Sequence, residues 1–126
     1  MWCRGIRGAI TVPDNDRENI MAATKRLLQE MLGANEFELD DVAAILFTTT
    51  PDLDAEFPAA ATRELGWSQH IAMLCGHEIN VPGSLPRCLR ILMLVNTEKE
   101  AGEIAHVYLE EARKLKEQNS APGGES

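Results

Sequence analysis

Alternating residues near the start of the chain predict a β-strand over Arg4–Val12. Successive side chains of a strand point to opposite faces, so this segment has one face of large apolar side chains and one of small ones. The large apolar side chains are Ile6, Ile10 and Val12. The small residues, which share their face with Arg7, are Gly5, Ala9 and Thr11. The strand therefore carries a cation on a face with space around it.

A helix is predicted after this strand. Residues 13–16 supply a turn and an N-cap, and mostly apolar residues then recur every three or four positions, which is the spacing of one helix face. These residues are Ile20, Met21, Thr24, Leu27, Leu28, Met31 and Leu32. We expect the helix to end at Gly33, because glycine readily adopts the left-handed conformation that ends many helices.

The middle of the chain predicts two strands separated by a short helix. Val42–Thr50 is rich in β-branched and apolar residues and predicts a buried strand. The short helix is expected over Pro58–Leu65, with Gly66 as its C-terminal cap. A further strand is expected over His70–Cys75, and the glycines and prolines of Gly76–Pro86 predict a loop.

The remaining segment begins with a strand and then becomes ambiguous. Arg87–Asn96 is apolar apart from its ends and Arg90, and predicts a strand. Thr97–Glu100 has the pattern of a capping box and predicts the start of a helix. Glu103–Lys116 favours helix by composition, whereas Val107–Leu109 is typical of a final strand, and both interpretations stay open.

This order of elements indicates an α/β (α+β) fold, with a mixed β-sheet and helices packed on one side. The 126 residues, 44% of them hydrophobic, are enough for one core, so we predict a single domain over residues 1–117. Residues 118–126 are predicted to form a disordered tail. The edges of such a sheet would be exposed in a monomer, and oligomerisation is a common way to cover them.

Charge and cysteine content narrow the possible functions. A net charge of -8 argues against nucleic acid or an anionic membrane as the main partner, because both attract basic surfaces. No segment reaches the length of a membrane span, and residues 1–5 lack the apolar core of a secretory signal. Cys3, Cys75 and Cys88 form no even disulfide framework, so we expect free thiols and a cytoplasmic protein.

Arg7 and Arg90 are the residues best suited to bind a ligand. Arg90 lies in an apolar strand, where a guanidinium normally needs an anionic partner. One interpretation is a structural ion pair with a core carboxylate, and the other is a site for a small anion. Glu78 follows the third strand and is either a site residue at a strand end or an ordinary surface glutamate.

A metal or cofactor site has little support in the sequence. Cys75, His77 and Glu78 lie close together in the chain, but no second His or Cys pair stands at a ligand spacing. The sequence also lacks the patterns of a catalytic triad, a phosphate-binding Gly-rich loop and a dinucleotide site. We therefore expect no metal and no cofactor.

Several separated blocks, taken in order, resemble one enzyme family. The blocks are Arg4–Val12, Thr50–Leu53, Phe57–Ala59, Arg63–Leu65, Cys75 with Glu78, Pro86–Arg90 and His106–Leu109. Together they resemble the monofunctional chorismate mutases of the AroH class, in register from Met1 to Lys116. The resemblance implies an isomerase that converts chorismate to prephenate in phenylalanine and tyrosine biosynthesis. It also implies a homotrimer with a pseudo-α/β-barrel core, in which each active site is shared between neighbouring subunits.

The resemblance implies three catalytic residues. Arg90 would donate to the ether oxygen, on which negative charge develops during the rearrangement. Arg7, together with Tyr108, would bind the enolpyruvyl carboxylate. Glu78, together with Cys75, would hold the ring hydroxyl.

Other residues are implied to bind the substrate without a direct part in the chemistry. Arg63, from an adjacent subunit, and Lys116 would face the ring carboxylate near the entrance. The apolar wall that keeps the substrate compact would consist of Phe57, Ala59, Leu74 and Leu115. The set is completed by Gly76 and His77, beside Cys75.

Three positions depart from the family pattern. The family often has lysine where this chain has Ala60, threonine where it has Leu74, and arginine where it has Lys116. The loss of cationic groups near the entrance should weaken binding of the substrate more than it slows the chemical step. We therefore expect a raised KM with a largely preserved kcat.

Two other functions stay open at this point. A trimeric enamine or imine deaminase of the RidA type has a similar architecture and also uses an arginine to bind a carboxylate. A non-catalytic anion-binding trimer would use Arg7 and Arg90 only to hold a metabolite.

Overall fold

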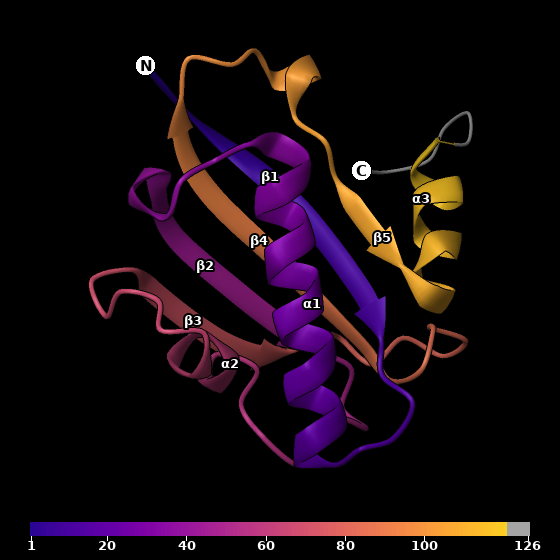
Figure 1. Cartoon of the computed structure of the whole chain (residues 1–126). Coiled ribbons are helices and arrows are strands. Elements are labelled where there is room, and N and C mark those ends of the chain that lie inside the picture. The colour runs from indigo at the N-terminus through magenta and orange to yellow at the C-terminus, as the bar shows by residue number, and fades with distance from the viewer. Residues whose placement is uncertain (121–126) are drawn as a thin grey trace.

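A computed structural model describes residues 1–120, and the side chains of residues 1–116. Its sheet has five strands in the order β3-β2-β4-β1-β5 (Figure 1). The strands are β1 (Trp2–Thr11), β2 (Val42–Thr49), β3 (Ala72–His77), β4 (Cys88–Thr97) and β5 (Val107–Leu109). β4 pairs antiparallel with both β1 and β2, whereas the outer strands β3 and β5 pair parallel with their neighbours. The sheet is therefore mixed, which confirms the predicted α+β class with a mixed sheet.

Helices connect the strands. The α-helices are α1 (Arg17–Asn35), α2 (Ala60–Glu64) and α3 (Arg113–Ser120), and the short 3-10 helices are η1 (Leu39–Asp41), η2 (Ala101–Glu103) and η3 (Glu110–Ala112). α1 lies across one face of the sheet, with α2 beside it, and α3 lies next to β5 (Figure 1). Among the described residues, no helix is both long and apolar enough to cross a membrane.

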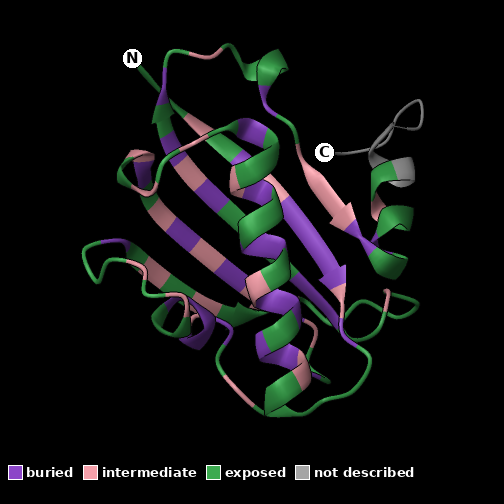
Figure 2. Cartoon of the chain, viewed as in Figure 1, coloured by how far each residue is buried: buried purple, intermediate pink, exposed green. Residues whose placement is uncertain are grey.

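The core lies between α1 and the sheet. Buried and more exposed residues alternate along β2 and β4, so each strand gives every second side chain to this core (Figure 2). Its fully buried large side chains include Ile6, Ile10, Leu27, Leu28, Ile45, Phe47, Leu89 and Met93. The alternation predicted for β1 is confirmed, because Ile6, Ile10 and Val12 all belong to this core.

The opposite face of the sheet is only partly covered. A small second cluster near β5 consists of Ala9, Cys88 and Ala112, against which Leu85, Tyr108 and Leu115 pack. Away from this cluster, apolar side chains of the same face are open to solvent, with Leu74 67% exposed and Leu92 38% exposed. We call this surface of β1–β4 the open face.

Gly8 determines how closely α1 approaches the sheet. A Cβ atom at this position would lie 2.4 Å from the sulfur of Met31, whose side chain is fully buried. Real carbon and sulfur atoms do not approach so closely, so any larger residue here would require the buried Met31 side chain or the helix to shift.

The predicted end of α1 at Gly33 is wrong. The helix continues to Asn35, and Glu36 (φ 58°) takes the left-handed cap position. Asn35 explains the extension, because its side chain donates to the Ala105 carbonyl (2.9 Å) and accepts from the Ala105 N–H (2.7 Å). These bonds connect the last turn of α1 to the segment that leads into β5.

Several other boundaries differ from the prediction, and the helix expected over Pro58–Leu65 is the shorter α2, Ala60–Glu64. The third strand covers Ala72–His77 instead of His70–Cys75, because its register follows β2, with His77 opposite Thr49. The capping box forms at Glu100 with Glu103, where it begins η2, and Thr97 instead ends β4.

The ambiguous C-terminal segment contains both predicted elements. Val107–Leu109 pairs with β1 as β5, and helix follows from Glu110 onward. Of the predicted tail, residues 118–120 form the end of α3, and 121–126 lie outside the described residues.

Candidate active site

Arg90 and Glu78 form an ion pair on the open face. The Nε atom of Arg90 in β4 lies 3.4 Å from Oε2 of Glu78, which follows β3. Thr48, opposite Arg90 on β2, donates its hydroxyl to the same carboxylate oxygen. The Glu78 N–H donates to the Thr49 carbonyl at 2.8 Å, so the glutamate is held at both its backbone and its side chain.

This pair is not a closed internal ion pair. The Arg90 side chain is 49% exposed and that of Glu78 is 27% exposed, so the guanidinium keeps a free side. The interpretation of Arg90 as the partner of a core carboxylate therefore does not hold. The exposed part of the guanidinium is accessible from the open face, and its forked donors are of the kind that binds a carboxylate.

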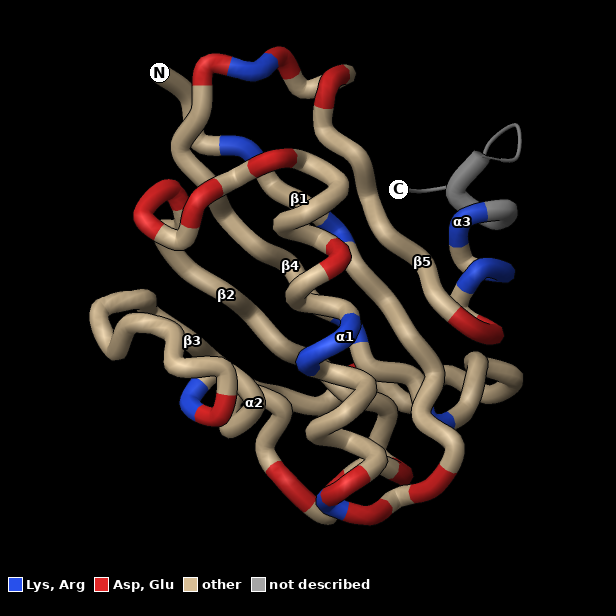
Figure 3. The backbone as a smooth tube through the Cα atoms, in the orientation of Figure 1, with Lys and Arg blue, Asp and Glu red and all other residues tan. Residues whose placement is uncertain are grey.

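Arg7 supplies a second cation on the same face. Ala9 is paired with Arg90 between β1 and β4, so Arg7 lies diagonally across from Arg90, at the spacing of about 7–8 Å that is usual for diagonal neighbours. The Nε atom of Arg7 is buried and has no hydrogen-bond acceptor within the part of the chain that the structure describes. A buried N–H without an acceptor is unfavourable, and an anionic ligand beside Arg7 would supply one. Figure 3 shows that acidic residues instead lie mainly in the connecting segments at the two ends of the sheet.

His106 holds the backbone of Arg7. The Arg7 N–H donates to Nδ1 of His106 at 2.9 Å, just before the point where β5 begins to pair with β1. Burial lowers the pKa of the His106 imidazole, and the charge of Arg7 lowers it further. Both effects favour the neutral ring, which is the form that can accept this hydrogen bond.

The small cluster beside the two arginines contains other predicted site residues. Tyr108 is opposite Ala9 in the β1–β5 register, and Leu115 packs against the same cluster from α3. Lys116 follows Leu115 in α3. Burial raises the pKa of the Cys88 thiol, an effect that the nearby charge of Arg90 opposes, so Cys88 is a neutral neighbour of the site.

The other predicted site residues form a separate group around β3 and α2. Phe57, Cys75, Gly76 and His77 line a cavity of about 310 Å³, and the wall of this cavity includes neither arginine. Phe57 is 70% exposed and Leu74 67% exposed. Ala59 is the N-cap of α2, and Arg63 is exposed within that helix. The cavity beside Phe57 is thus separate from the arginines, and Glu78, which follows His77 and pairs with Arg90, links the two groups.

His77 and Cys75 contact neighbouring residues of the same chain. Nδ1 of His77 lies 3.1 Å from the Thr49 hydroxyl. Burial raises the pKa of the Cys75 thiol, and a hydrogen bond with the Ala59 backbone opposes this effect. Within the described residues, no three His, Cys, Asp or Glu side chains are grouped so that they could hold a metal ion.

A model of the family described as chorismate mutase type I matches residues 3–119. The chain belongs to the chorismate mutase type I family. This confirms the family indicated by the sequence blocks.

Individual members of the chorismate mutase family agree with this result. The chain is 46% identical over 114 residues to chorismate mutase AroH of Thermus thermophilus, covering 90% of this chain and 93% of the relative. It is 44% identical over 110 residues to the Bacillus subtilis (strain 168) protein of the same name, with 87% of each covered. A solved chorismate mutase from Clostridium thermocellum superposes with a TM-score of 0.86 at 50% identity, covering 91% of this chain and all of that chain. Neither the deaminase nor the anion-binding alternative finds support in these similarities.

Two residues near the arginines of this chorismate mutase family member had no predicted role. Thr48 has a signal in the sequence, since it belongs to the polar end of a predicted strand. His106 lies in one of the blocks that resemble the family, but its bond to Arg7 joins residues 99 positions apart and has no local signal.

Proposed function

We propose that this protein is a chorismate mutase, converting chorismate to prephenate on the route to phenylalanine and tyrosine. Family membership supports the reaction. The observation that carries the proposal is the arrangement of Arg7 and Arg90 on one open face, with an unpartnered guanidinium N–H on one and Glu78 beside the other. This combination suits a substrate that has both carboxylates and a hydroxyl.

The rearrangement needs restraint and charge. In chorismate the ether C–O bond breaks as a new C–C bond forms within the same molecule, and electron density builds on the ether oxygen. A fixed guanidinium at this oxygen stabilises the transition state more than the ground state. Arg90 is suited to this role because Glu78 and Thr48 fix its surroundings before the substrate binds. The chain's own residues thus supply positioning and charge, and no proton has to move.

The remaining residues hold the substrate in its compact conformation. Arg7 and Tyr108 bind the enolpyruvyl carboxylate, and Glu78 and Cys75 hold the ring hydroxyl. Lys116 and Arg63 face the ring carboxylate. The apolar wall consists of Phe57, Ala59, Leu74 and Leu115, with Gly76 and His77 beside it.

A homotrimer would unite the two groups of residues. The exposure of Phe57 and Leu74, and the absence of Arg7 and Arg90 from the wall of the cavity beside Phe57, support a site completed by a neighbouring copy of the chain. In the trimer the open faces of three sheets pack into a pseudo-α/β-barrel core. We also propose a cytoplasmic location, which the three unpaired cysteines support because thiols stay reduced there.

The test is prephenate formation by the purified protein. We expect loss of chorismate absorbance with stoichiometric appearance of prephenate, and no ammonia release from imine substrates. Tight binding of a transition-state analogue without turnover of chorismate would instead support an anion-binding protein.

A further inference from the structure

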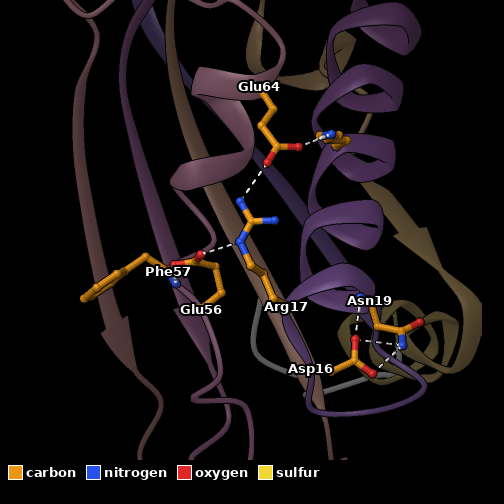
Figure 4. A network of polar contacts seen from close by, with 7 residues as sticks. Asp16, Arg17, Asn19, Glu56, Phe57 and Glu64 are labelled. Carbon is orange, nitrogen blue, oxygen red and sulfur yellow. Dashed lines mark hydrogen bonds and ion pairs between the residues drawn. The ribbon is translucent and has the colours of Figure 1, made fainter.

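Polar contacts attach the segment that carries Phe57 and Arg63 to the beginning of α1 (Figure 4). Just before α1, Asn15 accepts the backbone N–H groups of Asp54 (3.0 Å) and Ala55 (3.1 Å). Its amide also donates to the Asp54 carboxylate at 2.8 Å. The loop after β2 is therefore bound to the chain ahead of α1 by three hydrogen bonds.

Arg17 makes a forked contact with two carboxylates of this segment. Its Nε donates to Glu56 at 3.0 Å and its Nη2 donates to Glu64 at 2.8 Å (Figure 4). Lys25, also on α1, pairs with the same Glu64. The hydrogen bond to Glu64, followed by the one to Glu56, raises the pKa of Arg17, and contacts with Lys25 and then Arg17 lower that of Glu64.

The positions of these carboxylates in the chain are informative. Glu56 directly precedes Phe57, and its other oxygen accepts the Phe57 N–H at 2.8 Å. Glu64 directly follows Arg63. Each carboxylate bound by Arg17 thus lies next to a residue expected to contact the substrate.

Packing fixes the chain on both sides of Phe57 but not its side chain. The Phe57 side chain is 70% exposed, whereas Leu53, earlier in the loop, and Pro58, directly after it, are buried. Between these two anchors, the backbone at Phe57 is held by the Glu56 carboxylate and by the first turn of the helix that follows.

We propose that Arg17 is a positioning residue for the active site. By binding Glu56 and Glu64 together, it fixes the orientation of Phe57 and Arg63, and so the shape of the apolar wall and entrance. This inference rests on the proposed function. Preorganised surroundings lower the cost of substrate binding, so the effect of Arg17 belongs mainly to KM.

The test compares Arg17→Gln with a matched change on the same helix. Arg26→Gln also removes one arginine from α1 and breaks exposed ion pairs, but those are with Glu30 and Glu110. We expect Arg17→Gln to raise KM about five- to tenfold with kcat changed less than about twofold, while Arg26→Gln stays near wild type. Exposed ion pairs contribute little to stability, so Tm should shift by no more than a few degrees in either variant.

Further variants separate positioning from a general charge effect. Arg17→Lys can reach only one carboxylate at a time and should restore part of the affinity. The double variant Arg17→Gln/Glu56→Gln should raise KM by less than the product of the two single effects. The reason is that each single change already removes the same contact between Arg17 and Glu56. Equal increases in KM for Arg17→Gln and Arg26→Gln, or independent effects of Arg17 and Glu56, would overturn the inference.

A readout independent of turnover is amide hydrogen exchange. Loss of Arg17 should speed exchange at residues 54–57, and loss of Arg26 should not. Unchanged exchange at these residues contradicts the inference whatever the activity. If wild type leaves chorismate unchanged, the proposed function fails, whereas an active wild type with an unaltered Arg17→Gln variant removes only the inference about Arg17.

Discussion

At the scale of single residues, the proposed site depends on how each guanidinium is held. Arg90 has a carboxylate partner at 3.4 Å and half of its surface free, whereas Arg7 has a buried Nε without an acceptor among residues 1–116. A preoriented cation suits the developing charge, and a partly unsatisfied cation suits binding of a carboxylate. The two arginines are therefore suited to different tasks.

Replacing Arg90 tests the chemical role. Arg90→Ala should lower kcat by about 100- to 1000-fold, because it removes a fixed donor at the developing charge. Steady-state kinetics with chorismate measures this loss, and an unchanged Tm shows that the variant is folded. Near-normal turnover would contradict the role given to Arg90.

The hydrogen bond from Arg7 to His106 predicts a dependence of stability on pH. The pKa of His106 is lowered in the folded protein, so the unfolded chain binds a proton first as pH falls. Stability contributed by the neutral ring is complete above the ordinary histidine pKa of about 6.5 and is lost as pH falls below that value. His106→Asn keeps an acceptor but cannot titrate. Between pH 7.5 and 5.5, denaturant unfolding should show a smaller loss of stability for this variant than for wild type, and equal losses would contradict the prediction.

At the scale of elements, patterns within one segment were predictable and contacts between segments were not. Period-two alternation identified the buried face of β1, and helical spacing identified the buried residues of α1. The end of α1 was misplaced, because Asn35 is fixed by Ala105, seventy positions away. The register of β3 likewise follows its partner β2. The two arginines and Glu78 were predicted as site residues, but Arg17 and His106 act through residues distant in sequence and gave no local signal.

Two glycines provide a matched test of how α1 packs against the sheet. Gly33 is exposed within α1 and a Cβ there would meet nothing within 4 Å, so Gly33→Ala should raise the free energy of unfolding by about 0.5–1 kcal/mol. Gly8→Ala should lower it by about 1–3 kcal/mol, because the new Cβ would clash with Met31. Denaturant unfolding of both variants measures these changes. Two changes of the same sign would contradict the packing of α1 described here.

At the scale of the whole molecule, the open face is the feature that an isolated chain leaves unexplained. Leu74 and Leu92 expose apolar surface on the sheet, and the cavity beside Phe57 includes neither arginine in its wall. The proposed trimer answers both observations, since packing of the open faces buries the leucines and brings a second chain to each pair of arginines.

A charge on the open face tests the trimer. Wild type should have a solution mass of three chains, and Leu92→Glu should shift it towards one chain, with a matching loss of kcat/KM. Gln29→Glu adds the same charge on the exposed side of α1 and should leave both unchanged. Light scattering combined with chorismate assays measures the two effects. A monomeric wild type with full activity would rule out shared sites.

The contact between Glu78 and Arg90 has a consequence for ligand selectivity. Because the cation already has a counter-ion, a simple inorganic anion such as sulfate meets both the attraction of Arg90 and the repulsion of Glu78. A molecule that presents an anionic group to one and an alcohol to the other avoids this conflict. Competitive inhibitors that retain the alcohol should therefore bind more tightly than their deoxy counterparts.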